Sequence, residues 1–216
     1  MNIEIVSKGL SHASSTSIFI PLILCLIKYK AFNKQLKALF IYILACLVTE
    51  IFGLISLKYT DISYPVSYLF SIVETSLISY LFYQEWDKKF LKKNTIYFFS
   101  FFLLMSVGTL IITKSIASAE SIALPIEFTI IIILSIVHFH KVFTDLTIPK
   151  LTNYHFFWFS SAFLLYFGTN FFLTIFYTHI KTRNIEVMYL VGCIPLIMSI
   201  TYNILLGIGI WKIKQV

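Results

Sequence analysis

The chain has 216 residues, of which 58% are hydrophobic and only 12% are charged. Soluble domains are close to half apolar and one quarter charged, so this composition excludes an ordinary soluble domain and indicates an integral membrane protein. The formal net charge of +7 does not indicate a nucleic-acid-binding stripe, because the basic residues fall in short gaps between apolar runs. We therefore expect no direct nucleic-acid binding.

Seven apolar segments follow one another, most of them near the ~20 residues that a helix needs to cross ~30 Å of hydrocarbon. They lie at residues 14–27, 38–57, 62–83, 95–112, 121–139, 155–178 and 187–211. The first is the shortest, because the sequence before it is rich in serine. The runs are continuous rather than alternating, which argues against a β-barrel. We expect an all-α, polytopic transmembrane helical bundle of about seven spans, forming a single membrane domain over residues 1–216.

The connections between the segments, with the two termini, lie alternately on opposite sides of the membrane, and Lys and Arg are distributed unequally between the two sides. One side holds Lys28, Lys30, Lys34, Lys37, Lys88, Lys89, Lys92, Lys93, Lys141, Lys150, Lys212 and Lys214. The other holds only Lys8, Lys58, Lys114, Lys181 and Arg183. Because cytoplasmic loops carry the excess of basic residues, this predicts an outer N-terminus and a cytoplasmic C-terminus in the bacterial inner membrane.

Three glutamates interrupt the apolar segments. Glu74 lies near the middle of the third, and Glu50 and Glu127 lie in the second and fifth. A carboxylate at membrane depth costs several kcal/mol unless it is protonated, paired or hydrated, so each is a functional candidate. In the predicted orientation all three fall in the outer half of the membrane, as does Asn170 of the sixth segment. This predicts a polar pocket that opens outward.

Helical periodicity adds two polar faces, which should turn inward because lipid offers no hydrogen bonds. One comprises Tyr64, Tyr68, Ser71, Thr75 and Ser79, with Glu74 beside it, and the other comprises Tyr166, Asn170, Thr174 and Tyr177. The alternative is purely structural: interhelical hydrogen bonds in which protonated carboxyls donate. The candidate pocket residues are Glu50, Glu74, Glu127, Asn170, Ser71 and Thr75.

Prolines and glycines predict features of helix packing. We expect Pro125 in the first turn of its helix and Pro195 inside the last helix, where it can introduce a kink. Gly168, Gly207 and Gly209 are expected to permit close helix contact.

Residues 85–93 form the predicted third loop, which contains Lys88, Lys89, Lys92 and Lys93. This loop is the best candidate in the sequence for a contact with a cytoplasmic protein. The alternative is that it anchors the chain to anionic lipid headgroups.

Catalytic motifs are missing from the sequence: it has no H-E-x-x-H, G-x-S-x-G or G-x-x-x-x-G-K pattern. Cys25, Cys46 and Cys193 have neither disulfide nor zinc spacing. His138 and His140, two residues apart, do not share a helix face and give only a weak metal signal. We expect a protein that is not an enzyme and has no metal or cofactor.

Seven spans with an outer N-terminus and a cytoplasmic C-terminus resemble the membrane input modules of bacterial sensor kinases. The segment from Tyr64 to Glu74, YPVSYLFSIVE, is similar to stand-alone bacterial seven-helix proteins. The usage of Ile, Lys and Phe, with size and topology, also resembles the multi-pass accessory proteins of type VI CRISPR (RNA-targeting) loci. That resemblance implies a modulator of an RNA-guided defence nuclease.

Two functions follow as expectations. The first is a non-enzymatic regulatory or accessory protein of the inner membrane, which senses a signal or modulates a cytoplasmic partner in antiviral defence. The second is a small proton-coupled transporter, or a pore-forming subunit of a homo-oligomer, that uses Glu74, Glu50 and Glu127.

Overall fold

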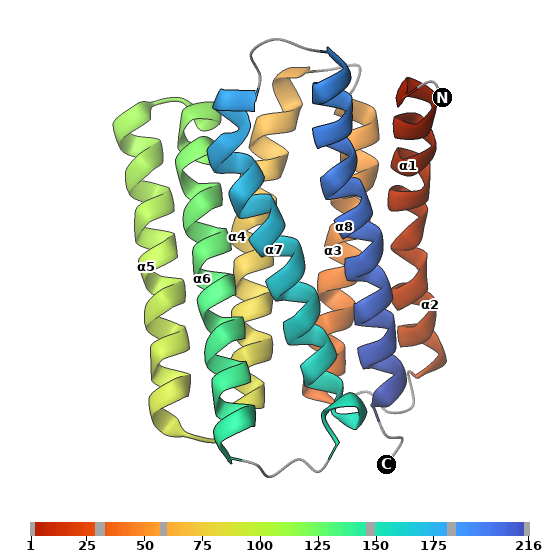
Figure 1. The fold of residues 1–216 in the computed structure, drawn as a ribbon. Helices are drawn as coiled ribbons and strands as arrows, with labels where there is room; N and C mark the ends of the chain where they lie inside the picture. The colour runs from red at the N-terminus through yellow and green to blue at the C-terminus, as the bar shows by residue number, and fades with distance from the viewer. Residues whose placement is uncertain (1–2, 29–32, 57–59, 146–149, 181–184, 214–216) are drawn as a thin grey trace. The chain divides into compact units, whose positions relative to one another are not determined.

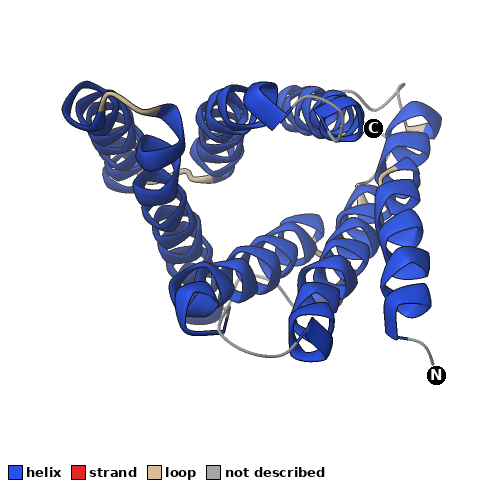
Figure 2. Ribbon diagram, turned by 90° about the horizontal axis from the view of Figure 1, so that it is seen from above, coloured by secondary structure: helices blue, strands red, loops and turns tan. Residues whose placement is uncertain are grey.

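The computed structural model describes residues 3–28, 33–56, 60–145, 150–180 and 185–213. Within these ranges the regular structure consists of α-helices and one short 3₁₀ helix, without strands (Figures 1 and 2). The helices are α1 (Ile3–Ser17), α2 (Phe19–Ile27), α3 (Lys34–Ser56), α4 (Thr60–Glu85), α5 (Lys89–Thr113), α6 (Ile116–Asp145), η2 (Leu151–Asn153), α7 (His155–Ile180) and α8 (Ile185–Lys212).

Seven stretches of the described chain are long and apolar enough to cross a membrane, with α1 and α2 together supplying the first of them. This confirms the all-α class and the seven candidate spans, and it indicates an integral membrane protein. The orientation and the bacterial inner membrane stay predictions. Five of the basic residues used for the orientation lie outside the described residues, namely Lys30, Lys58, Lys181, Arg183 and Lys214.

The chain divides into two compact units, and α6 begins in one and ends in the other. Unit 1 comprises Met1–Ala31 and Ser135–Val216, and unit 2 comprises Phe32–Leu134. The single membrane domain expected over residues 1–216 stays a prediction.

Unit 1 is organised around α8, against which α7, α1 and α2 all pack (Figure 1). Close approach is possible because α8 carries small residues at its contacts. A methyl group on Gly209 would lie 2.3 Å from Phe159 Cε1, and one on Gly207 would lie 3.0 Å from Ile20 Cγ2. The prediction of close contact therefore holds for these two glycines. It is wrong for Gly168, which has open space around it.

The first span begins earlier than predicted, at Ile5 rather than residue 14. The serine-rich stretch is helical, and its hydroxyls bond to carbonyls one turn back in the same helix, so they need no partner elsewhere. Thr16 Oγ1 donates to His12 O at 2.9 Å, and Ser17 Oγ donates to Ser14 O at 2.6 Å. The break at Ile18 has a different cause: Pro21 lacks the N–H that would bond to Ser17 O.

Unit 2 is organised around α4, which packs against α3 and α5. The core includes the fully buried side chains of Tyr42, Ile78, Phe82 and Phe102. At one end, Gln35 Nε2 of α3 donates to Glu85 Oε2 of α4 at 2.6 Å. This bond places the beginning of α3 beside the end of α4.

Two prolines lie inside helices of unit 2. Pro65 lies in α4 and Pro125 in α6. The expectation that Pro125 occupies a first turn is wrong, because α6 already begins at Ile116. Pro195 lies inside α8, in unit 1, as expected.

Candidate functional site

The predicted polar face of α4 is buried within unit 2. Tyr68, Ser71, Glu74, Thr75 and Ser79 are each at most 8% exposed. The exception is Tyr64, which was expected on the same face but is 52% exposed. A continuous row of polar groups therefore faces the interior of this unit along α4.

Glu74 is held by a phenol from α3. Tyr42, itself 1% exposed, donates from its hydroxyl to Glu74 Oε1 at 2.7 Å. Cys46, one turn along α3 from Tyr42, lies within electrostatic range of Glu74 and of Glu50. The carboxyl group of α4 is thus fixed against one face of α3.

Thr75, the next residue, connects α4 to α6. Its Oγ1 lies 2.8 Å from Ser71 O and 2.8 Å from Glu127 Oε1. A hydroxyl has only one proton to donate, and a backbone carbonyl can only accept. Both contacts are complete hydrogen bonds when Glu127 carries a proton and donates it to Thr75, which in turn donates to Ser71.

Glu127 is 0% exposed, and its second oxygen, Oε2, has no hydrogen-bond partner among the described residues. It lies within electrostatic range of Glu74. Two ionised carboxylates in such apolar surroundings would repel each other and lack hydration, so at least one is more stable with a proton. Chemically, this carboxyl pair can bind and release a proton.

The other predicted pocket residues do not join this pair by a hydrogen bond that the structure shows. The Glu50 side chain on α3 is exposed. Asn170 belongs to unit 1, where it is half-buried and its amide donates to Tyr166 O at 2.8 Å. Their participation in one outward pocket stays a prediction.

Sequence reasoning missed two polar residues of unit 2, Tyr42 and Glu120, and the partner of a third, Tyr68. Tyr42 was read as part of an apolar run, although a phenol in a helix interior needs an acceptor. Tyr68 was placed correctly, but its bond to Ser106 O, at 2.6 Å, was not foreseen. Glu120 fell outside the predicted segment, yet it is only 8% exposed inside α6.

The predicted lysine loop is shorter than expected, because α5 already begins at Lys89. Of its four lysines only Lys88 precedes the helix. The ammonium group of Lys92 lies 5.2 Å from the ring centre of Tyr83, and that of Lys93 lies 5.4 Å from the ring centre of Tyr97. These cation–π contacts fix two of the lysines against aromatic rings at this end of unit 2.

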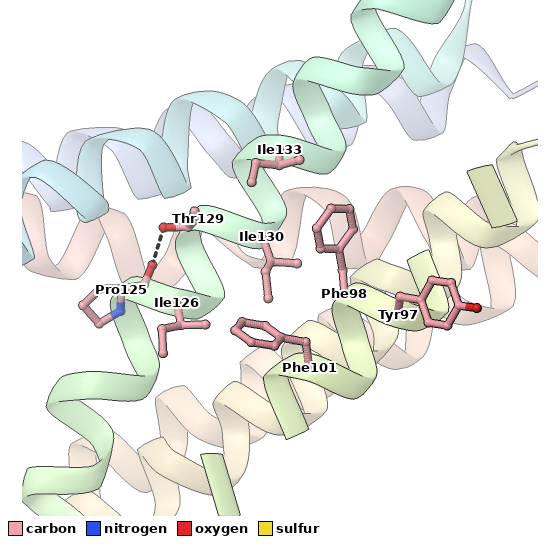
Figure 3. A pocket seen from close by; sticks show the side chains of 8 residues that line it. All are labelled: Tyr97, Phe98, Phe101, Pro125, Ile126, Thr129, Ile130 and Ile133. Atoms are coloured by element: carbon pink, nitrogen blue, oxygen red, sulfur yellow. Dashed lines mark hydrogen bonds between the residues drawn. The ribbon is translucent and has the colours of Figure 1, made fainter. Parts of the chain in front are cut away.

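Two grooves flank α5. The α5–α6 groove has a volume of about 600 Å³ and is almost entirely apolar. Figure 3 shows Phe101 of α5 pointing toward Ile126 of α6, and Thr129 donating to Pro125 O at 2.7 Å. The α4–α5 groove has a volume of about 280 Å³ and is lined by Ser76, Ser79, Tyr80, Tyr83, Thr95, Ile96 and Phe99. Neither groove is lined by Glu74 or Glu127.

Within the described ranges, no group of three or more His, Cys, Asp or Glu side chains is arranged to hold a metal ion. The three cysteines are free. Comparisons add no relative: no protein-family model matches the chain, and no curated protein or solved structure gives a significant match.

Proposed function

We propose that this chain is a non-enzymatic regulatory or accessory protein of the bacterial inner membrane, in which the Glu74–Glu127 pair is a proton-dependent switch. The observation that carries the proposal is the position of Thr75 Oγ1, 2.8 Å from both Ser71 O and Glu127 Oε1. This geometry is complete when Glu127 holds a proton and is incomplete without it.

Loss of that proton would leave a buried carboxylate close to Glu74. Repulsion between the two groups, and the need of Glu127 for water, would favour separation of α6 from α4 in unit 2. Helix α4 carries Glu74 and Thr75 at its middle and ends beside the lysine segment Lys88–Lys93. A movement of α4 is therefore a direct physical route from the carboxyl pair to Lys88, Lys89, Lys92 and Lys93.

The lysine segment is the proposed contact for a cytoplasmic protein. Three of its lysines, Lys88, Lys89 and Lys93, are exposed. Their positive charge suits an acidic surface on the partner. The resemblance noted above suggests a defence ribonuclease or a signalling kinase in that role.

The test is affinity purification of the full chain from its native host in mild detergent, followed by native mass measurement of the complex. A stoichiometric partner that is lost with Lys88→Gln/Lys93→Gln, but kept with Lys34→Gln/Lys37→Gln, is the expected result. Glutamine at position 127 cannot release a proton, so the amount of partner bound to Glu127→Gln should not change with pH. Recovery of the chain without any partner, or equal loss with both lysine pairs, contradicts the regulatory proposal.

A second function, proton-coupled transport or a pore formed by a homo-oligomer, is favoured by one observation. Glu127 Oε2 has no hydrogen-bond partner in the described part of the chain, as expected of a group that exchanges its proton. Glu74 and Glu127 would titrate, and Glu50 would extend the path from its exposed position on α3. Proton flux into liposomes should then be lost with Glu74→Gln and kept with Tyr64→Phe. Flux no greater than in protein-free liposomes excludes this function.

A further inference from the structure

We propose that the α4–α5 groove binds one acyl chain of an anionic glycerophospholipid, whose phosphate group is held by Lys89 and Lys92. This site shares Lys89 and Lys92 with the partner contact proposed above, but it does not depend on the carboxyl pair, which does not line the groove. Three features of unit 2 support this site: the groove lining, the row of residues along α5, and the charge at the beginning of that helix.

The groove combines exposed apolar walls with a buried polar floor. Tyr80 is 41% exposed and Ile96 is 52% exposed, so the walls face outward from candidate membrane spans. Ser79 is only 5% exposed, and its Oγ has no hydrogen-bond partner among the described residues. Such a hydroxyl is unusual in a wall that merely faces lipid tails, since a buried polar group normally finds a partner. A small shift of the lining side chains would bring this hydroxyl within reach of an ester oxygen of a bound lipid.

The same face of α5 carries both the groove wall and two lysines. Lys89, Lys92, Ile96 and Phe99 are spaced by three and four residues, so they form one row along the helix. Lys92 also lies over the ring of Tyr83, which lines the groove. The row therefore leads from the apolar α4–α5 groove to two ammonium groups. A phospholipid has the same order, with its acyl chain at one end and its phosphate group at the other.

The beginning of α5 is short of negative charge. Its N-cap, Lys88, makes no side-chain capping bond, and its first turn contains no acidic residue. Lysine ammonium groups at this end are repelled by the positive end of the helix dipole. The first N–H groups of the helix also lack helical acceptors. Two acidic residues lie nearby: Glu85, which accepts from Gln35, and Asp87. With four lysines against these two acids, the segment remains cationic, and a phosphate would satisfy both the lysines and the N–H groups.

The volume suits part of a lipid. About 280 Å³ is enough for a portion of one acyl chain, and the rest of the molecule would remain in the bilayer. A lysine cluster next to a groove between membrane helices is the arrangement by which proteins retain anionic headgroups. The larger α5–α6 groove lacks a comparable polar floor and serves as the internal control.

The experiment is native mass spectrometry of the full chain, purified in mild detergent and offered equal amounts of phosphatidylglycerol and phosphatidylcholine. The ratio of the two lipids in the first-bound position measures the preference for the anionic headgroup. A lysine near a membrane surface contributes about a fivefold preference, so Lys89→Gln/Lys92→Gln should lower the ratio about 25-fold. The control pair Lys34→Gln/Lys37→Gln removes the same charge from the adjacent end of α3, off the row that lines the groove, so it should lower the ratio clearly less than the α5 pair does.

A second variant tests the groove itself. Ser76→Phe places a ring in the α4–α5 groove and should remove the first-bound lipid, whereas Thr129→Phe, in the α5–α6 groove, should not. If Ser76→Phe is not monodisperse, Ile96→Trp fills the groove from the opposite wall. An unchanged ratio in Lys89→Gln/Lys92→Gln overturns the proposal. So does an equal fall with the α3 pair, which would show diffuse attraction, or full retention of lipid in the filled groove.

Discussion

The hydroxyl group of Tyr42 on α3 donates a 2.7 Å hydrogen bond to Glu74 Oε1 on α4, and both side chains are buried. Through this bond the carboxyl of α4 is satisfied by a neighbouring helix rather than by water. Since Thr75 bonds to Glu127 at 2.8 Å, two consecutive residues of α4 connect it to α3 and to α6. Unit 2 therefore has a polar centre to which three helices contribute.

Removing the phenol hydroxyl should weaken this centre. Tyr42→Phe leaves the ring in place but removes the donor to Glu74, and we expect a loss of stability of about 1 kcal/mol, as for buried bonds between membrane helices. Denaturant-induced unfolding in detergent micelles measures the difference. Tyr64→Phe, which alters a 52% exposed ring on α4, is the control and should leave stability unchanged. Equal effects of the two substitutions would show that the Tyr42 bond is not stabilising.

The contact of α8 with α7 should be intolerant of any side chain at Gly209. A methyl group there would lie 2.3 Å from Phe159 Cε1 and 3.1 Å from His155 O. Gly209→Ala should therefore separate the helices and cost about 1–3 kcal/mol. On the same helix, Gly192 has nothing within 4 Å, and Gly192→Ala should be neutral or slightly stabilising. Thermal unfolding of both variants decides the matter. If the two midpoints coincide, the α7–α8 contact is not as close as described.

The seven candidate spans could be predicted because an uninterrupted apolar run has the length of a membrane helix whatever its neighbours are. The residues at which the helices begin were harder to predict. Helix α5 extends to Lys89 since lysine stems can remain helical while the ammonium group reaches outward. Helix α1 includes the serine-rich stretch, in which Thr16 and Ser17 satisfy their hydroxyl groups within their own helix.

Partners across helices could not be predicted from the same information. The spacing of Ser71, Thr75 and Ser79 indicates one face of α4, but it does not say which helix lies opposite. That choice depends on the shapes of the packed side chains and on residues such as Tyr42, a single phenol in an otherwise apolar run. For this reason Glu74 was identified from sequence, whereas its bond to Tyr42 was not.

In unit 1 a polar pair connects the first and last helices. Asn203 Nδ2 of α8 donates to Ser17 Oγ of α1 at 2.7 Å, and both residues are buried. Asn203→Leu would leave Ser17 without this donor and should cost about 0.6–1.7 kcal/mol. Thr201→Val, whose exposed hydroxyl bonds only within its own helix in the described contacts, is the matched control. Limited proteolysis provides the readout, since weakening this pair should expose α1. Equal cleavage of both variants would contradict the role of the pair.

Whether Glu127 carries a proton can be tested by replacing this residue with glutamine, whose amide N–H is a permanent donor. Glu127→Gln presents an amide N–H to Thr75 in place of the carboxyl O–H, so it should keep stability within about 0.5 kcal/mol. Thr75→Val removes the group that both Ser71 O and Glu127 contact, and it should cost about 1–3 kcal/mol because the buried carboxyl is left unsatisfied. Combining the two substitutions should then cost less than the sum of the single effects, since they share one interaction.

Unfolding of the two single variants and of the double variant in detergent micelles gives the required cycle, with Thr129→Val as a control for loss of an exposed threonine. An ionised Glu127 would give the opposite order. The amide would then lose a charge-assisted bond, and Glu127→Gln would be at least as destabilising as Thr75→Val. That order would mean that Thr75 donates its proton to a carboxylate and that Ser71 O lacks this donor, and the proton-dependent switch would lose its structural basis.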